Sequence, residues 1–308
     1  MPSNERNIAV IFINWFHAGR TIASVARIGR WRRLHPAVFV VCNGDTPAGR
    51  ASLRDACTGH ARFLELPNNA GFAGGNNAGI RAALEAGFDK IALINTDAEI
   101  AEDDFATLLQ AFGQVRDLAA ASPLIVERDG ARESVYAGGQ DISRARQTRI
   151  VFGGEGSNAR FTHPDHLMGT VLVTRSAAWR RVGPLDEAYF FSGEVADWCE
   201  RARAQGFALA VDREARAFHD AAMAGDGARD GDYLYYSLRN RFLFIARHRV
   251  RRKAFLFARW TVIALFEAAK ALATGRFNRA RACLAAARDG VRGRWGARHP
   301  AGGAPGHG

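Results

Sequence analysis

Short apolar runs alternate with amphipathic stretches along most of this chain. The apolar runs predict buried strands at residues 8–13, 37–42, 62–66, 91–94, 119–126, 168–173 and 207–211. Helical spacing of apolar residues predicts helices at 20–30, 77–86 and 102–115. Strands that alternate with helices predict an α/β fold, with a mostly parallel sheet flanked by helices. The stretch 127–166 is richer in glycine, arginine and polar residues, and we expect a loop-rich excursion there.

Residues 67–79 form the most distinctive polar stretch, with the sequence PNNAGFAGGNNAG. It stands between the strand at 62–66 and the next predicted helix. Gly71, Gly74 and Gly75 permit backbone conformations and close approaches that a Cβ atom would forbid. The first N–H groups of the helix are therefore expected to face an anion such as a phosphate. A glycine-rich loop alone is also typical of an ordinary turn from strand to helix.

Asn95-Thr96-Asp97 follows the apolar run at 91–94. Such a run predicts a buried parallel strand, and open α/β sheets bind ligands just outside the carboxyl ends of their strands. Asp97 is therefore a candidate metal ligand. Together with the glycine-rich stretch it supplies what a sugar-diphosphate site needs, which is close backbone approach and a metal-binding carboxylate.

The two motifs together resemble those of the family 2 glycosyltransferases, inverting enzymes of the GT-A fold. In the bacterial rhamnosyltransferase-like branch the pattern is N-x-G-F-A-G-G-N-N-x-G followed by L-N-P-D or L-N-T-D, and residues 69–79 and 95–97 match it. The resemblance covers about residues 7–248 and implies a Rossmann-like GT-A sheet flanked by helices. It also implies that the sugar donor is bound by Gly71, Phe72, Gly74, Gly75, Asn76, Asn77 and Asn95.

An acidic segment at residues 189–203 resembles the family stretch F-F-x-x-x-E-D-V-D-x-C-x-R, which carries the base that activates the acceptor. If a helix begins at Glu194, Asp197 and Arg201 share its face. Val195 stands where the family usually has the Asp of its Glu-Asp pair. The base is then either Glu194 or Asp197. A surface helix with ion pairs is the structural alternative.

Two further matches follow. Residues 217–219 end an apolar strand and resemble the family's V-x-H, in which the histidine joins the metal shell; His219 is the candidate. A lone histidine is more often structural than a ligand, but its place after Asp97 and Glu194 in the order of motifs leaves the two interpretations about equal. Residues 235–241 resemble Y-Y-x-x-R-N-R. Arg239 or Arg241 would neutralise the leaving diphosphate, since a guanidinium binds phosphate in a fixed fork.

The match near the N-terminus is less complete. Asn14-Trp15 resembles the family's N-Y-N or N-W-N, and V-C-N-G-D at residues 41–45 stands where V-D-N-G-S is usual. Asn14, Asn43 and Asp45 are therefore candidate donor-binding residues. Cys42 replaces an Asp that in the family often hydrogen-bonds a pyrimidine, and a thiol is a poor acceptor. The nucleotide of the donor is thus left open.

The formal net charge of +11 is concentrated in the last part of the chain. From Arg239 onward there are sixteen Arg or Lys residues and two acidic residues, so the preceding part is slightly acidic. Charges interrupt the apolar run at 254–273, so we expect it to lie on a bilayer and not to cross it. A helix packed on the core and a nucleic-acid surface are the alternatives, and the second is disfavoured. Aromatic side chains lie among the cations, as in helices at a headgroup interface: Phe255, Phe257, Trp260, Phe266 and Phe277.

These patterns divide the chain into a GT-A glycosyltransferase domain at 1–248, a basic amphipathic helical appendage at 249–290 and a flexible tail at 291–308. No signal-peptide pattern and no uncharged apolar run long enough to span a bilayer occur, so we expect a cytoplasmic protein, peripheral on the inner face of the cell membrane. Four cysteines without a C-x-x-C pair argue against a zinc site and a disulfide framework.

The resemblance therefore implies a metal-dependent, inverting hexosyltransferase of cell-surface polysaccharide synthesis. Mg²⁺ or Mn²⁺ is held by Asp97 and His219 against the diphosphate of a nucleotide-sugar donor. Glu194 or Asp197 takes a proton from a hydroxyl of a glycan or lipid-linked acceptor. A catalytically impaired scaffold at the membrane is the alternative, suggested by the two departures from the family pattern. A dinucleotide oxidoreductase is disfavoured because no Gly-x-Gly-x-x-Gly turn follows the first strand.

Overall fold

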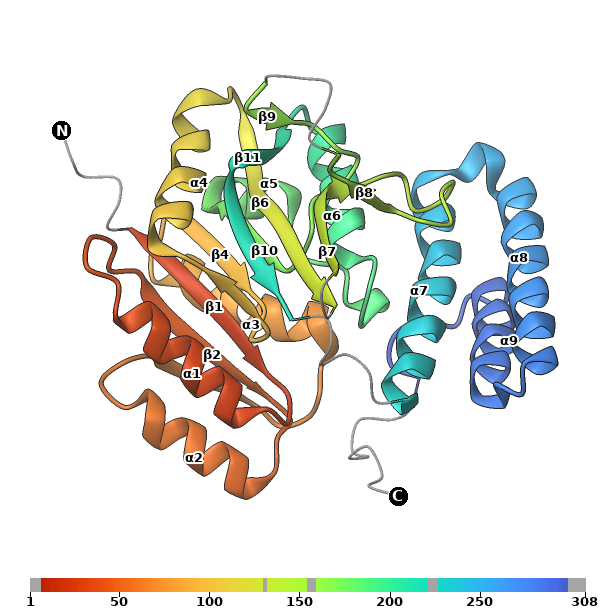
Figure 1. Ribbon diagram of the computed structural model, residues 1–308, viewed down its shortest axis with the longest axis horizontal. Helices are drawn as coiled ribbons and strands as arrows, with labels where there is room; N and C mark the ends of the chain where they lie inside the picture. The colour runs from red at the N-terminus through yellow and green to blue at the C-terminus, as the bar shows by residue number, and fades with distance from the viewer. Residues whose placement is uncertain (1–6, 130–131, 154–158, 221–226, 299–308) are drawn as a thin grey trace.

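The computed structural model describes residues 7–129, 132–153, 159–220 and 227–298. Their strands form one mixed sheet of eleven strands, whose main path runs β3-β2-β1-β4-β10-β6-β11-β5. Helices cover both faces of this sheet. A separate group of helices, α7 to α9, lies to one side of it, beyond α6 (Figure 1).

The N-terminal half of the sheet is parallel, and helices return the chain between its strands. Its elements are β1 (Ile8–Asn14), α1 (Ala18–Gly29), β2 (Ala37–Asn43), α2 (Pro47–Cys57), β3 (Arg62–Leu66), α3 (Gly71–Glu85) and β4 (Lys90–Ile94). Strand β1 pairs in parallel with β2 and β4, and β2 pairs in parallel with β3. Neighbouring side chains of β1 enter opposite faces: Val10 belongs to the core under α1 and α2, and Ile11 to the core under α3. The carboxyl ends of these strands therefore meet at one edge.

The C-terminal half of the sheet is mixed, which corrects the prediction of a mostly parallel sheet. Its elements are β5 (Ala98–Ile100), α4 (Glu102–Gln114), β6 (Leu118–Asp129), β7 (Arg132–Gly139), β8 (Arg149–Val151), β9 (Phe161–Thr162), β10 (Val171–Arg175), α5 (Ser176–Val182), η1 (Glu187–Tyr189), α6 (Glu194–Ala204) and β11 (Ala208–His219). Strand β10 is antiparallel to β4 and β6, whereas β11 is parallel to β6 and antiparallel to β5. The stretch 127–166, predicted to be loop-rich, contains β7, β8 and β9. These strands pair at the margin of the sheet and lack the long apolar runs of buried strands.

Helix α3 begins at Gly71 and not at residue 77, so Gly74 and Gly75 are helical. Gly71 has a φ of +72°, and a Cβ atom there would overlap the carbonyl oxygen of Phe190. Glycine is unfavourable in a helix, and the sequence pattern therefore predicted a later start. Close packing of Gly71, Gly74 and Gly75 against the sheet and the neighbouring segment overrides the low helix propensity of glycine.

Three helices form a unit beside the sheet: α7 (Gly227–His248), α8 (Lys253–Ala273) and α9 (Phe277–Val291), with η3 (Val250–Arg252) before α8. Phe242 and Ile245 of α7 are buried in one cluster with Cys283 of α9. A Cβ atom at Gly290 would press into the ring of Phe242. The boundary predicted at residue 248 falls at the end of α7, yet α7 packs with the two helices that follow it.

The chain after α9 returns along α7 to the segment before α6. The Gly296 N–H donates to the carbonyl of Ala188 at 2.8 Å. Arg239 Nη1 in turn donates to the carbonyl of Gly296 at 2.7 Å. The first part of the predicted flexible tail, 291–308, is therefore held by contacts, and residues 299–308 lie outside the described residues.

Candidate functional site

Asp97 and His219 meet at the edge where the parallel strands end. Asp97 lies between β4 and β5, and His219 is the last residue of β11, where it pairs with Ala98. His219 Nε2 is 3.6 Å from Asp97 Oδ2. The other carboxylate oxygen, Oδ1, is buried and has no hydrogen-bond partner among the described residues. Asn95 is half-buried beside them, and its N–H donates to the carbonyl of Thr170 at 2.9 Å.

Glu127 of β6 is a third member of this cluster, which the sequence pattern did not reveal. His219 Nδ1 lies 3.0 Å from Glu127 Oε1, and Arg149 donates to the same oxygen at 2.6 Å. Burial alone would lower the pKa of His219, but hydrogen bonds to Asp97 and Glu127 and their charges raise it to about 9. Glu127 is opposite His219 in the β6–β11 register. That pairing could not be read from residues so far apart in the chain.

Asp97 and His219 fit a divalent cation that takes further ligands from a substrate. Within the described ranges, no group of three or more His, Cys, Asp or Glu side chains is arranged to hold a metal ion by itself. Burial opposes ionisation of Asp97, but the hydrogen bond and charge of His219 hold the pKa of its carboxyl below the usual range. An ionised carboxylate with an oxygen that is unpartnered among the described residues, together with the imidazole of His219 once a cation displaces its proton, suits Mn²⁺ or Mg²⁺.

Glu194 begins α6 and is buried, with 5% of its surface exposed. Its Oε2 atom has no hydrogen-bond partner in the described part of the chain. Burial raises the pKa of Glu194 to about 7, and the charge of Asp197 acts in the same direction. A carboxyl group whose pKa lies near neutrality is suited to accept a proton as a general base.

Asp197 is instead held in an ion-pair network. Arg201 Nε donates to one carboxylate oxygen at 2.8 Å, and His248 Nε2 lies 2.7 Å from the other, to which the Tyr189 hydroxyl donates at 3.3 Å. Burial opposes ionisation, but the hydrogen bond from His248 and the charge of Arg201 hold the pKa of Asp197 below its usual range. Both carboxylate oxygens of Asp197 are therefore already engaged in hydrogen bonds. Glu194 is the stronger of the two candidate bases.

Two predicted donor-binding asparagines use their amides to hold backbone segments together. Asn43 Nδ2 donates to the carbonyl of Gly71 at 3.1 Å, and its Oδ1 accepts the N–H of Ala70 at 2.8 Å. Asn77 exchanges two hydrogen bonds with the backbone of Leu185, at 2.9 and 3.0 Å. Both asparagines are buried. These contacts position the glycine-rich segment, and direct contact of either asparagine with a donor stays a prediction.

Asn14 and Asp45 form a pair near the same edge. Asn14 Nδ2 donates to Asp45 Oδ2 at 2.6 Å, and Asn14 Oδ1 accepts the hydroxyl of Thr21 at 2.8 Å. Asn14 is fully buried and Asp45 is partly exposed, so Asp45 is the member that a ligand can reach. Cys42 points into the apolar core beside Leu53, and burial raises the pKa of its thiol.

The first N–H groups of α3 are occupied by the protein itself. The N–H of Phe72 donates to the carbonyl of Phe190 at 2.7 Å, and that of Ala73 to the same oxygen at 3.4 Å. The prediction that the helix start faces an anion is therefore wrong at these two groups. Asn76 is also buried, and its Nδ2 donates to the carbonyl of Phe72 at 3.0 Å within the helix.

Of the two arginines predicted to bind phosphate, Arg239 is buried and Arg241 is half-buried, and both donate to backbone carbonyls. Arg239, with 1% of its surface exposed, donates to the carbonyl of Tyr189 at 2.9 Å and to that of Gly296. Arg241 donates to the carbonyl of Ile142 at 2.6 Å, and burial lowers its pKa to about 10. These hydrogen bonds fasten α7 to neighbouring segments, and a role of either guanidinium group in phosphate binding stays a prediction.

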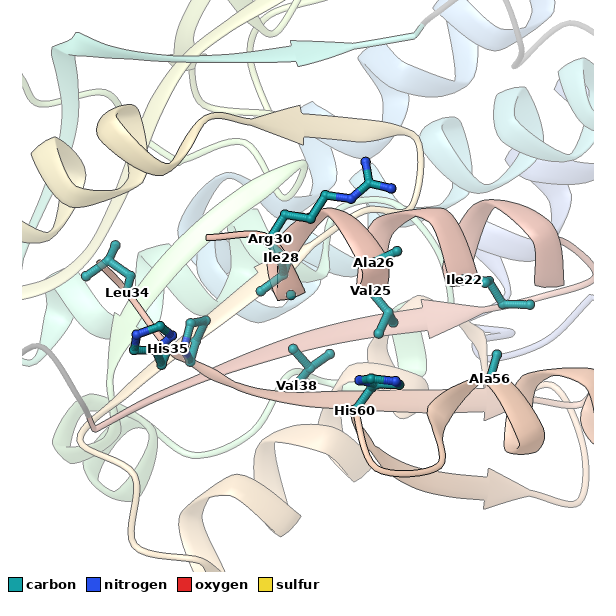
Figure 2. A pocket seen from close by; sticks show the side chains of 12 residues that line it. Ile22, Val25, Ala26, Ile28, Arg30, Leu34, His35, Val38, Ala56 and His60 are labelled. Atoms are coloured by element: carbon teal, nitrogen blue, oxygen red, sulfur yellow. The ribbon is translucent and has the colours of Figure 1, made fainter. Parts of the chain in front are cut away.

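A cleft of about 390 Å³ lies between α1, the end of α2 and the start of β2 (Figure 2). Its lining is mostly apolar, with Arg30, His35 and His60 among the polar side chains. It reaches Val38 at the amino end of β2, whereas Asp97 follows the carboxyl end of β4. The cleft is thus at the opposite end of the parallel strands, and we do not assign the donor to it.

The chain matches a known family and a characterised relative. The family described as glycosyl transferase family 2 matches residues 17–170. The low-salt glycan biosynthesis hexosyltransferase Agl10 of Haloferax volcanii is 26% identical over 211 residues, which cover 67% of this chain and 66% of that protein. The chain therefore spans slightly less than two thirds of this relative.

Two solved structures share the fold. The crystal structure of GalNAc-T7 with UDP, GalNAc and Mn²⁺ has a TM-score of 0.61 at 14% identity, covering 79% of this chain and 48% of that chain. The mannosyltransferase PcManGT from Pyrobaculum calidifontis, in complex with GDP-Man and Mn²⁺, has a TM-score of 0.57 at 14% identity, covering 94% and 88%. At this identity the likeness shows the fold alone, and it confirms the predicted GT-A fold. The family match extends over half of the sequence, and the chain belongs to glycosyl transferase family 2.

Proposed function

We propose that this glycosyltransferase moves a hexose from a nucleotide-diphosphate donor to a hydroxyl of a glycan or lipid-linked acceptor, in cell-surface polysaccharide synthesis. The observation that supports this most is the contrast between two carboxyl groups. Asp97 has a lowered pKa and an oxygen at the sheet edge with no hydrogen-bond partner among the described residues, whereas Glu194 has a pKa of about 7. Environments that separate two pKa values in this way assign one group to a permanent charge and the other to proton transfer.

In this proposal Asp97 and His219 would hold Mn²⁺ or Mg²⁺, which would neutralise charge on the diphosphate. Glu194 accepts the acceptor's hydroxyl proton at Oε2, the atom for which the described residues offer no hydrogen-bond partner. The hydroxyl oxygen bonds to the anomeric carbon on the face opposite the diphosphate. The diphosphate leaves with the bonding electron pair, so the configuration inverts and no covalent enzyme intermediate forms.

The known proteins support the donor class. GalNAc-T7 was solved with UDP and Mn²⁺, PcManGT with GDP-Man and Mn²⁺, and Agl10 is named a hexosyltransferase. The donor screen starts with rhamnosyl donors, because residues 69–79 match the rhamnosyltransferase-like pattern.

The test is release of nucleoside diphosphate from a panel of nucleotide sugars, with a lipid extract of the source organism as acceptor. We expect release with one donor class, its dependence on Mn²⁺ or Mg²⁺, and its loss on chelation. The competing scaffold function is favoured by Val195, which is buried in the core at the position of the family's Asp. Absence of release with every donor, despite measurable nucleotide binding, would support the scaffold.

Helix α8 presents an apolar face to solvent. Phe255, Val262 and Phe266 are 69%, 65% and 61% exposed, and their spacing places them on one side of the helix. The other side is buried in the helical unit through residues such as Trp260 and Ala264. No helix in the described ranges has both the length and the apolar character to cross a bilayer.

We propose that this α8 face lies on the cytoplasmic membrane surface, close to a lipid-linked acceptor. Exposed cations flank it: Arg251 and Arg252 precede α8, and Lys270 is in its last turn. Each basic residue near an anionic surface contributes about 1 kcal/mol, so the cations and the apolar face favour the same orientation.

A double variant, Phe255→Glu with Phe266→Glu, is expected to stay folded and to bind anionic vesicles at least roughly tenfold more weakly, because two inserted rings are replaced by repelled charges. Co-sedimentation measures this. Val151→Glu is the matched control, since Val151 is 67% exposed on β8, and it should bind like the original protein. Deletion of α8 and α9 is a poorer test because it would expose Phe242 and Ile245. Unchanged sedimentation of the double variant would contradict the proposal, and salt-sensitive binding to DNA would favour nucleic acid.

A further inference from the structure

The turn between η1 and α6 has an unusual backbone. Phe190, Ser192 and Gly193 have φ values of +62°, +69° and +101°. Side-chain-bearing residues rarely adopt this left-handed conformation, and it persists only where the surrounding structure holds it. The next residue is Glu194. The place of the proposed base therefore depends on what holds this turn.

Asn240 of α7 holds it directly. The Asn240 Nδ2 lies within hydrogen-bond distance of three turn carbonyls, those of Tyr189 at 3.0 Å, Phe191 at 2.8 Å and Ser192 at 2.5 Å. Arg239 Nε donates to Asn240 Oδ1 at 2.7 Å and so fixes which way the amide points. Asn240 is 1% exposed, so water does not compete for these carbonyls.

The same turn also sets the start of α3. The carbonyl of Phe190 accepts the N–H groups of Phe72 and Ala73, and Gly71 is the residue that leaves room for this oxygen. One short segment thus touches both the glycine-rich helix and the helix that begins with Glu194. A shift of the turn would move both.

Helix α7 also contacts α6 directly, at a second point. His248, at the end of α7, contacts Asp197 at 2.7 Å, one turn beyond Glu194 on α6. Helix α7 therefore holds the first helical turn of α6 at two points. One is the η1–α6 turn that precedes it, and the other is Asp197. Packing of α7 with α9 keeps α7 itself in place.

We infer that Asn240 is a positioning residue, through which α7 sets the location of the Glu194 carboxyl relative to the start of α3. This inference rests on the proposed function, because it takes Glu194 as the base. Asn240 acts on the reaction through the turn and does not touch a substrate.

Asn240→Ala is expected to lower kcat by about 10- to 100-fold while the donor KM changes by less than roughly threefold, because a misplaced base affects proton transfer more than donor binding. The acidic limb of the kcat–pH profile should also move. That limb reflects the ionisation of Glu194, whose pKa is raised in part by the charge of Asp197. Asp197 is itself paired with Arg201 and His248.

Tyr235→Phe is the matched control. It removes one buried hydrogen bond from α7, that of the Tyr235 hydroxyl to Asp289 at 3.0 Å, keeps the ring beside Arg239, and leaves the Asn240 amide with its carbonyl partners in the turn. We expect its kcat to stay within about threefold of the original value and its pH limb to stay in place. Equal losses of kcat in the two variants, with no shift of the limb in either, would overturn the inference.

Hydrogen exchange gives a readout that does not need activity. In Asn240→Ala the amides of Phe72 and Ala73 and those of residues 190–194 should exchange faster, and in Tyr235→Phe they should not. If Asn240→Ala fails to fold, Gly193→Ala perturbs the same turn with the Asn240 amide intact, since its Cβ would lie 3.0 Å from Tyr189 Cδ1 at a φ of +101°. It should reproduce the loss of kcat, and near-normal kcat would count against the inference. If no donor is used even by the original protein, the proposed function fails, while altered exchange still supports the role of Asn240 in the turn.

Discussion

Asp97→Asn is expected to reduce sugar transfer by about 10²-fold or more and to leave the fold intact. The amide keeps the shape of the side chain but removes the negative charge that would bind a cation against the leaving diphosphate. His219 would also lose a charged partner, now 3.6 Å away. The measurements are kcat/KM at saturating Mn²⁺ and binding of Mn²⁺ in the presence of a nucleoside diphosphate.

Asp104→Asn provides the control for this experiment. Asp104 lies at the start of α4 and accepts the N–H of Arg216 on β11 at 2.8 Å, so the same chemical change is made near the same strand but away from Asp97. It should retain near-normal transfer. Near-normal transfer by Asp97→Asn as well would remove the basis of the metal assignment.

Glu194→Gln is expected to lower kcat by about 10²- to 10⁴-fold with donor binding preserved, because the amide cannot accept the proton. In the original protein, transfer should rise with pH and level off above about 7, as the carboxyl ionises. Isothermal titration with the donor nucleotide and a pH series of kcat separate binding from proton transfer.

The same substitution should stabilise the protein at alkaline pH. Glu194 has a pKa of about 7 when folded and 4.5 as a free group, so the folded state favours the protonated form. The contribution of Glu194 to the free energy of unfolding is then fully present below pH 4.5. It is lost as pH rises through 7, by roughly 3 kcal/mol. Glu194→Gln should therefore raise the Tm at pH 8 and leave it nearly unchanged at pH 4.

Asp197→Asn should behave in the opposite way. Because the folded protein lowers the pKa of Asp197, its contribution to stability is present at neutral pH and disappears as pH falls through the folded value. The variant should lose Tm at pH 7 and lose less activity than Glu194→Gln, once compared at a temperature where both are folded. A larger loss of kcat in Asp197→Asn would reverse the assignment of the base.

The positions of two candidate residues at strand ends were predicted correctly from the sequence, while their roles stay predictions. Asp97 follows a buried parallel strand, and His219 ends another strand; both reach the same edge because their strands belong to one sheet. The family match and the GT-A likeness confirm the fold that these motifs predicted. Glu127 was missed because only the pairing of β6 with β11 places it beside His219.

Residue type alone does not show where a polar side chain also binds the backbone. Arg239, Arg241, Asn43 and Asn77 have the right chemistry to hold a donor, and each is hydrogen-bonded to backbone atoms. A sequence shows which groups can donate hydrogen bonds, but it does not show whether a neighbouring segment already accepts them. The choice between Glu194 and Asp197 was open for the same reason, since His248 lies far away in the chain.

The contact between Gly296 and Ala188 has a consequence for how the enzyme is made. Domains fold progressively during synthesis, and every strand of the sheet has been translated once residue 219 is complete. Helix η1, just before the turn that leads to Glu194, accepts the N–H of Gly296 at Ala188, and Arg239 donates to the carbonyls of both Tyr189 and Gly296. A nascent chain on the ribosome can therefore complete its sheet, and the edge that carries Asp97, before the segment that precedes Glu194 gains all its contacts. If Glu194 is the base, as proposed, sugar transfer should be acquired later than the fold of the sheet.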